Sequence, residues 1–255
     1  DLHSFPTRRS SDLANITPSA THAMTARIAE KRAEGKEIIT FSIGEPDFPT
    51  PAPIVEACMQ AVREGKTKYT QTNGIALLRQ AICEKLRKEN DLVYTPDQIC
   101  VSAGAKQALS NAVFALCDKG DEVLVPIPCY VSYLEIIKLA GGVPVTVASN
   151  EDFSLNVENF RKALTPRTKL ILLNSPNNPT GAVYSRESLK ELGWLVEENN
   201  LFVVSDEVYE KLLYDGAEHV SIAALSDELR ERTVTVNGFS KTFSMTGWRL
   251  GYTAS

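Results

Sequence analysis

The chain has 255 residues, of which 43% are hydrophobic and 23% charged, and its formal net charge is -5. This composition is typical of a globular protein with a sizeable core, and the negative charge argues against nucleic acid or an anionic membrane as a partner. No apolar run approaches the roughly 18 residues of a membrane span, and no apolar segment of a signal peptide opens the sequence. Five cysteines without a CxxC pair and three scattered histidines predict reduced thiols, a cytoplasmic location and no metal site.

The predicted elements follow a regular order after an irregular start. Residues 1–13 show no helical or strand period and are expected to be a disordered or foreign tail. Helices are predicted over 19–34, over 51–64 with Thr50 as the N-cap, and over 75–89. Apolar runs then alternate with helical segments, at 98–102, 122–126, 143–147, 169–174, 201–205, 233–237 and 248–253. This alternation predicts a three-layer α/β/α fold, with a mainly parallel seven-stranded sheet covered on both faces.

Such sheets bind ligands beyond the carboxyl ends of their strands, so the residues that follow each predicted strand are the candidate site. Five strand ends carry polar or aromatic residues: Gly104-Ala105-Lys106, Tyr130, Asn178, Asp206 with Tyr209, and Lys241. Each alone could be an ordinary turn, helix cap or core residue. Their occurrence together favours a site for one flat, phosphorylated cofactor.

Lys241 indicates which cofactor this is. It lies in GFSKTFSMTGWRLGY, where Arg249 is the other charged residue, and a lysine in a partly apolar pocket can act as a nucleophile. A lysine amine forms a Schiff base with an aldehyde, which is the chemistry of pyridoxal 5′-phosphate (PLP). A carboxylate for the pyridine nitrogen, a phenol and an amide for the ring hydroxyl, and an aromatic ring for the cofactor face are available in Asp206, Tyr209, Asn178 and Tyr130. Helix N-terminal N–H groups and a cation for the phosphate are available in Gly104, Ala105, Lys106 and Arg249.

The chain resembles the class I and II aminotransferases, which are fold type I PLP enzymes, and within them the bacterial aspartate aminotransferase subgroup. The similarity runs from about Ile16 to Gly251, in the stretches PSAT, GEPDFPTP, GKTKYTQTNGI, NSPNNPTGAVY, SDEVYE and SKTFSMTGWRLGY. The resemblance implies that Lys241 carries PLP and then moves the proton between the substrate Cα and the cofactor. It implies that Asp206 pairs with the pyridine nitrogen, and that the ring hydroxyl is bound by Tyr209 and Asn178.

The resemblance also implies partners and substrates. Tyr69 is expected to reach the phosphate of the neighbouring subunit's cofactor, which implies a homodimer. Gly44 is expected beside the substrate, whose α-carboxylate Asn178 helps to hold. Ser19 and Lys106 match residues that recognise an acidic side chain. This match favours aspartate as the amino acid and 2-oxoglutarate as the 2-oxo acid, while prephenate and other acids remain possible substrates. For Lys106, a solvated lysine in the first turn of a helix is the alternative.

Two features depart from the family pattern. Gly238 stands where many relatives have a phosphate-binding serine, and Ser240 is the candidate substitute. Relatives extend well beyond Ser255, so a C-terminally truncated chain is expected, with most of the small domain missing. Residues 14–46 are then expected to form the N-terminal arm and part of the small domain, and 47–255 the PLP-binding large domain.

Three alternatives stay open from the sequence. Another fold type I enzyme, such as a C–S β-lyase or a cyclopropane-carboxylate synthase, shares the PLP motifs. An inactive fragment could bind PLP without turnover. An aminotransferase-like effector domain of a transcription regulator would require a DNA-binding module upstream, and no such module is evident in residues 1–40.

Overall fold

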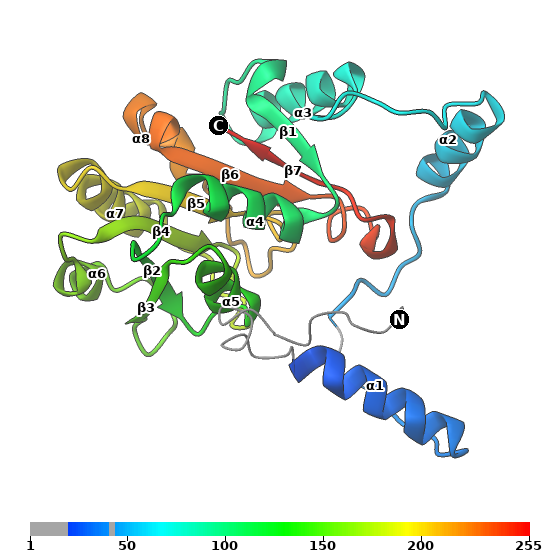
Figure 1. The fold of residues 1–255 in the computed structure, drawn as a ribbon, viewed down its shortest axis with the longest axis horizontal. Coiled ribbons are helices and arrows are strands. Elements are labelled where there is room, and N and C mark those ends of the chain that lie inside the picture. Colours follow the sequence, from blue (N-terminus) through cyan, green and yellow to red (C-terminus); the bar gives the residue numbers. More distant parts are fainter. Residues whose placement is uncertain (1–19, 41–43) are drawn as a thin grey trace, which may run out of the picture.

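The computed structural model describes residues 20–40 and 44–255, and a seven-stranded sheet organises them (Figure 1). Its strands are β1 (Ile99–Ser102), β2 (Glu122–Ile127), β3 (Val143–Ala148), β4 (Thr168–Asn174), β5 (Phe202–Asp206), β6 (Thr233–Gly238) and β7 (Gly251–Ala254). The spatial order is β1-β7-β6-β5-β4-β2-β3. Only β7 runs antiparallel to its neighbours, β1 and β6, in this part of the chain. The predicted mainly parallel sheet is therefore confirmed.

Helices cover both faces of the sheet and make three layers (Figure 1). On one face, α4 (Ala105–Leu116) and α5 (Ser132–Leu139) share a core with Leu170 and Leu172 of β4. The other face holds α6 (Val157–Ala163), α7 (Arg186–Glu198) and α8 (Asp227–Arg232), which share a core with Ile171 and Leu173. Successive strand side chains point to opposite faces, so an unbroken apolar strand supplies both cores at once.

The N-terminal helices differ in how they pack. The helix α3 (Ala76–Glu89) contributes Ile82 and Leu86 to a third apolar cluster with β1 and β7. The helices α1 (Ala20–Ala33) and α2 (Ala52–Arg63) lie outside the three layers (Figure 1). No residue of α2 is buried. Among the described residues, no helix combines the length and the apolar character that crossing a membrane requires.

Two boundaries differ from the sequence-based prediction, and both differences affect the site. The sequence predicts Thr50 as the cap of α2, but the N-cap is Pro51 without a side-chain bond, and the Thr50 hydroxyl donates to Ser244 O at 2.6 Å. The last strand begins at Gly251, because residues 246–248 form a 3-10 turn and Arg249 adopts a left-handed conformation with φ 54°. That conformation interrupts strand geometry, which requires negative φ.

Candidate functional site

The carboxyl ends of the parallel strands bring the predicted residues together. In the sheet, Asn174 at the end of β4 lies beside Asp206 at the end of β5, and Asp206 lies beside Val236 of β6. Asn178 follows β4, and Lys241 follows β6. The ends of three adjacent parallel strands therefore deliver an amide, a carboxylate and an amine to one edge, as the predicted sheet requires.

Asp206 is a buried carboxylate held by hydrogen bonds. Its Oδ2 accepts from the Tyr133 hydroxyl at 2.8 Å, and its Oδ1 accepts from the Val208 N–H at 3.2 Å. Burial raises the pKa of Asp206 to about 6, against the Tyr133 and Val208 bonds, which lower it. No lysine or arginine in residues 20–40 and 44–255 forms an ion pair with this carboxylate, so a cation placed beside it would further stabilise its charged form.

Tyr209, Asn178 and Lys241 form a second group at the same edge. The Asn178 amide donates to the Tyr209 hydroxyl at 3.1 Å. The Lys241 amine lies 5.6 Å from the centroid of the Tyr209 ring. These are the three side chains that the sequence assigned to the Schiff base and the ring hydroxyl, and the fold brings them within reach of one small ring.

The Lys241 amine also contacts Gly44, 197 residues away, by donating to its carbonyl oxygen. Burial lowers the pKa of Lys241, against the opposing charge of Glu45, because desolvation disfavours the ammonium form. Lys241 is then deprotonated in a larger fraction of the molecules, and the free amine is the nucleophilic form.

The start of α4 forms a cradle with Arg249. Gly104 precedes the helix with φ 88°, and a Cβ at this position would lie 2.3 Å from Arg249 Nη2. Glycine therefore allows the guanidinium to approach the helix N-terminus, where the first N–H groups lack intrahelical acceptors. A cation and a helix N-terminus together suit a phosphate group.

Lys106 and Tyr130 lie beside this cradle. The exposed Lys106 amine is 5.5 Å from the centroid of the half-buried Tyr130 ring. Ser240 is half-buried next to Lys241. A Cβ at Gly238 would lie 3.2 Å from the Ala105 Cβ, so a side chain at position 238 would press on the first turn of α4.

Of the other predicted residues, Tyr69 is fully exposed and is not part of this group, and the prediction for Ser19 lies outside the described residues. One contributor was missed by sequence reasoning. Tyr133 resembles an ordinary apolar position in the first turns of α5, and its burial and its bond to Asp206 appear only in the folded chain.

The site fits PLP by its chemistry. A buried carboxylate that has no cationic partner among the described residues suits a protonated pyridine nitrogen, the Gly104–Arg249 cradle suits a phosphate, and Lys241 suits an aldehyde carbon. The fold and the site thus define a fold type I PLP-dependent protein.

Comparison with known proteins agrees with this class. Residues 36–255 match the family described as aminotransferase class I and II, and the chain belongs to this family of PLP-dependent transferases. It is 48% identical over 241 residues to an aspartate aminotransferase of Bacillus sp. strain YM-2, covering 94% of this chain and 62% of that protein. It is 51% identical to a probable aspartate/prephenate aminotransferase of Aquifex aeolicus, with 96% and 62% covered.

Solved structures agree in fold. The structure of Thermus thermophilus aspartate aminotransferase with maleate superposes with a TM-score of 0.93 and 47% identity, covering 97% of this chain and 64% of that one. An aromatic aminotransferase from Pyrococcus horikoshii superposes with a TM-score of 0.83 and 47% identity, with 89% and 62% covered. The chain therefore spans about 62% of the length of the curated relatives it matches.

Proposed function

We propose that the protein is an aminotransferase that moves the amino group of an acidic L-amino acid, aspartate, to 2-oxoglutarate in two half-reactions of a ping-pong cycle. One observation carries the proposal. The Lys241 amine, with its lowered pKa, lies over the Tyr209 ring at the sheet edge where Asp206 is buried with no ion-pair partner in the part of the chain that the structure describes. In this proposal, 47–255 is the PLP-binding large domain and 14–46 contributes an N-terminal arm.

The residues divide the work of the reaction. When bound, PLP supplies an electron sink for a carbanion at the amino acid α-carbon. Asp206, held by Tyr133, would keep a proton on the pyridine nitrogen. Tyr209 and Asn178 would bind the ring hydroxyl, and Asn178 would also help to hold the substrate α-carboxylate. Lys241, as a free amine, would take the proton from the substrate Cα and deliver it to the cofactor.

The substrate proposal rests on charge. Lys106 places an exposed ammonium group beside Tyr130 at the mouth of the site, which would favour a side-chain carboxylate. The printed names of the similar proteins include aspartate and aspartate/prephenate aminotransferases. Gly44, whose carbonyl accepts from Lys241, would lie beside the substrate, and Ser19 would assist Lys106.

The protein is also proposed to act as a homodimer. Large apolar side chains of the N-terminal segments are exposed, including Met24, Phe48, Met59, Val62, Tyr69 and Leu77. Exposed apolar side chains of this size are candidates for a protein interface, and a second copy of the chain would cover them. Tyr69 would then reach the phosphate of the partner's cofactor.

Borohydride trapping tests the cofactor site. The purified chain is mixed with PLP, its visible spectrum is recorded, the adduct is reduced with borohydride, and the modified peptide is mapped by mass spectrometry. A pyridoxyl group on Lys241 is expected, and Lys241→Ala should lose it while Lys138→Ala, a change on the outer helix α5, should keep it. Labelling spread over many lysines of the folded chain would contradict the proposal.

A further inference from the structure

The turn that follows β5 has two different faces. Asp206 and Tyr209 take part in the site described above, while Glu207 and Glu210 turn into a separate buried cluster with 1% and 4% exposure. The Glu210 N–H donates to the Glu207 carbonyl at 3.0 Å, which closes a tight turn. In such a turn the position of one side chain depends on the positions of its neighbours. Whatever holds the two glutamates therefore also determines where Asp206 and Tyr209 lie.

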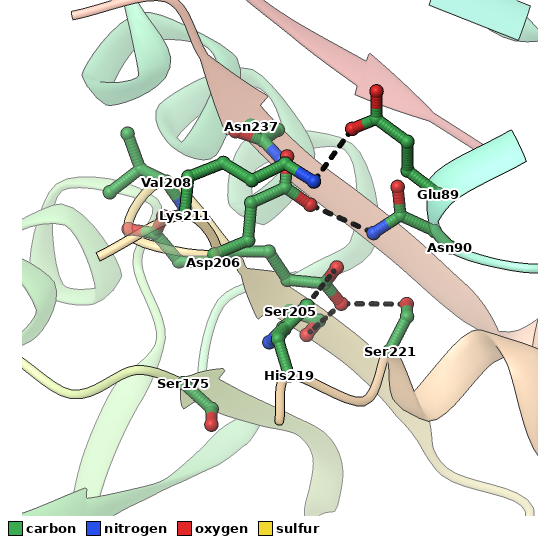
Figure 2. A network of polar contacts seen from close by, with 12 residues as sticks. Glu89, Asn90, Ser175, Ser205, Asp206, Val208, Lys211, His219, Ser221 and Asn237 are labelled. Atoms are coloured by element: carbon green, nitrogen blue, oxygen red, sulfur yellow. Dashed lines mark hydrogen bonds and ion pairs between the residues drawn. The ribbon is translucent and has the colours of Figure 1, made fainter. Parts of the chain in front are cut away.

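Glu207 is held by three donors. Its Oε1 accepts from the Ser205 hydroxyl at 2.9 Å and from the Ser221 hydroxyl at 2.8 Å. His219 Nε2 lies 3.0 Å from Oε2. Figure 2 shows Ser205, His219 and Ser221 gathered around one carboxylate. A buried carboxylate with this many donors is strongly oriented.

The Glu210 carboxylate accepts hydrogen bonds from a residue of helix α3 and from the residue that follows this helix. The Lys85 amine donates to its Oε1, and the Asn90 amide donates to its Oε2 at 2.8 Å. Glu207, Glu210 and His219 are close enough together to hold a metal ion. However, each carboxylate oxygen already has a protein donor, and the Lys85 ammonium takes the place of a cation. The cluster is therefore complete as a set of protein charges.

The charges of the cluster favour the protonated form of His219, although its buried Nδ1 has no hydrogen-bond partner among the described residues. Two buried carboxylates need two cations, and Lys85 supplies one of them. Burial works to lower the pKa of His219, but the charge and the hydrogen bond of Glu207 outweigh it, so the pKa is raised above its ordinary value. With His219 protonated, the cluster behind Asp206 is neutral.

We propose that the cluster of Glu207, Glu210, Lys85 and His219 is a charge-balanced anchor for the 206–210 turn, and that His219 is its positioning residue. By neutralising Glu207, His219 keeps an uncompensated negative charge away from the neighbouring Asp206 carboxylate. The consequence for cofactor binding rests on the proposed function, whereas the anchoring of the turn does not.

Other charged and titratable groups surround the anchor. Outside it, Lys211 pairs with Glu89 at 2.8 Å (Figure 2). Lys85 also lies 4.0 Å from Glu89. The charge of Glu207 acts on Asp206, Tyr94 and Tyr252, that of Glu210 acts on Tyr252, and Arg230 acts on Tyr94. Apart from Glu207, none of these is the hydrogen-bond partner of His219 in the described residues, so a change at His219 acts first on Glu207.

The test uses His219→Gln, Glu207→Gln and the double variant, with Glu122→Gln as the control. Glutamine at 219 keeps a donor and removes the charge. Glu122 is likewise buried and ion-paired, with Arg167, but it lies at the opposite end of the sheet, at the start of β2. The readout is the pKa of Asp206, followed by carboxyl ¹³C NMR in the cofactor-free protein. PLP affinity, measured by absorbance titration, is the second readout.

The expected pattern separates charge from packing. His219→Gln should raise the pKa of Asp206 by about half a unit or more, because it leaves Glu207 uncompensated. Adding Glu207→Gln should return that pKa to nearly the wild-type value, and Glu122→Gln should not move it. PLP affinity should fall in the single variant and recover in the double variant. The anchor would be overturned if His219→Gln left the pKa of Asp206 unchanged. It would also be overturned if the pKa of Asp206 in the double variant differed from wild type by more than in His219→Gln. Absence of PLP binding in the wild type, with the pKa pattern intact, would overturn the proposed function alone.

Discussion

Tyr133 donates a hydrogen bond of 2.8 Å to Asp206, although 73 residues separate them in the sequence. The phenol is fully buried, and the bond lowers a carboxyl pKa that burial raises. This contact joins α5 to the end of β5, which means that the state of the Asp206 carboxylate depends on a helix that follows β2, two strands away in the sheet. The charge available to a pyridine nitrogen is therefore set partly by Tyr133.

Tyr133→Phe removes this donor and little else. The pKa of Asp206 is expected to rise further, and PLP affinity to fall by about tenfold, since hydrogen bonds to charged groups contribute about 1.5–3 kcal/mol. Absorbance titration with PLP measures the affinity. Tyr184→Phe is a matched control, because Tyr184 is equally buried but lies in the core on the opposite face of the sheet. Equal losses in the two variants would argue against a specific role for Tyr133.

Asp206 predicts a pH dependence of the cofactor-free protein. Its pKa is raised to about 6 in the fold, from an ordinary value of 3.8. The unfolded chain therefore ionises first, and the stability contributed by Asp206 is present below its ordinary pKa and lost as the pH rises through about 6. At about pH 8, urea denaturation should show that Asp206→Asn has a free energy of unfolding higher than wild type by on the order of 1–3 kcal/mol. At about pH 4 the free energies of unfolding of the two proteins should be nearly equal. A difference that does not change with pH would contradict this prediction.

Gly104→Ala tests the phosphate cradle. The new Cβ would meet the Arg249 guanidinium and would also adopt an unfavourable positive φ. Gly120→Ala is a matched control, because Gly120 has φ 93° and no neighbouring atom within 4 Å of the place that a Cβ would take. Both variants should lose roughly 1 kcal/mol of stability from backbone strain. Only Gly104→Ala should bind PLP more weakly while retaining affinity for pyridoxal, which lacks the phosphate.

Lys106→Ala tests substrate selection. If Lys106 recognises a side-chain carboxylate, kcat/KM for aspartate should fall by about tenfold or more, while kcat/KM for an apolar amino acid should be unchanged. Lys119→Ala, which removes a lysine beyond the far end of α4, should change neither. Equal losses for both amino acids would assign Lys106 to the cofactor or to solvent instead.

Tyr69→Phe tests the contribution of a second copy. A mixed dimer of Tyr69→Phe with Lys241→Ala would contain one site with both native residues if Tyr69 acts across the interface. Separately tagged chains, refolded together and purified by both tags, should therefore recover about half of the wild-type activity per dimer. Recovery should fail if Tyr69 serves the site of its own chain.

The sequence by itself determined most of the fold and indicated the candidate site residues. Unbroken apolar runs encode strands buried on both faces, and the polar residues after those runs must meet at one edge once the strands are parallel. Asp206, Asn178, Tyr209 and Lys241 were identified in this way, and the structure brings them together.

Only the tertiary structure decided which distant residues act on these side chains. Three hydrogen bonds join residues far apart in the sequence: Tyr133 to Asp206 across 73 residues, Lys241 to Gly44 across 197, and Lys85 to Glu210 across 125. Local patterns report burial and turn chemistry but carry no information on strand order, such as the insertion of β7 between β1 and β6. The position of each predicted residue followed from its own strand, whereas its charge and orientation depend on the neighbours that the sheet order selects.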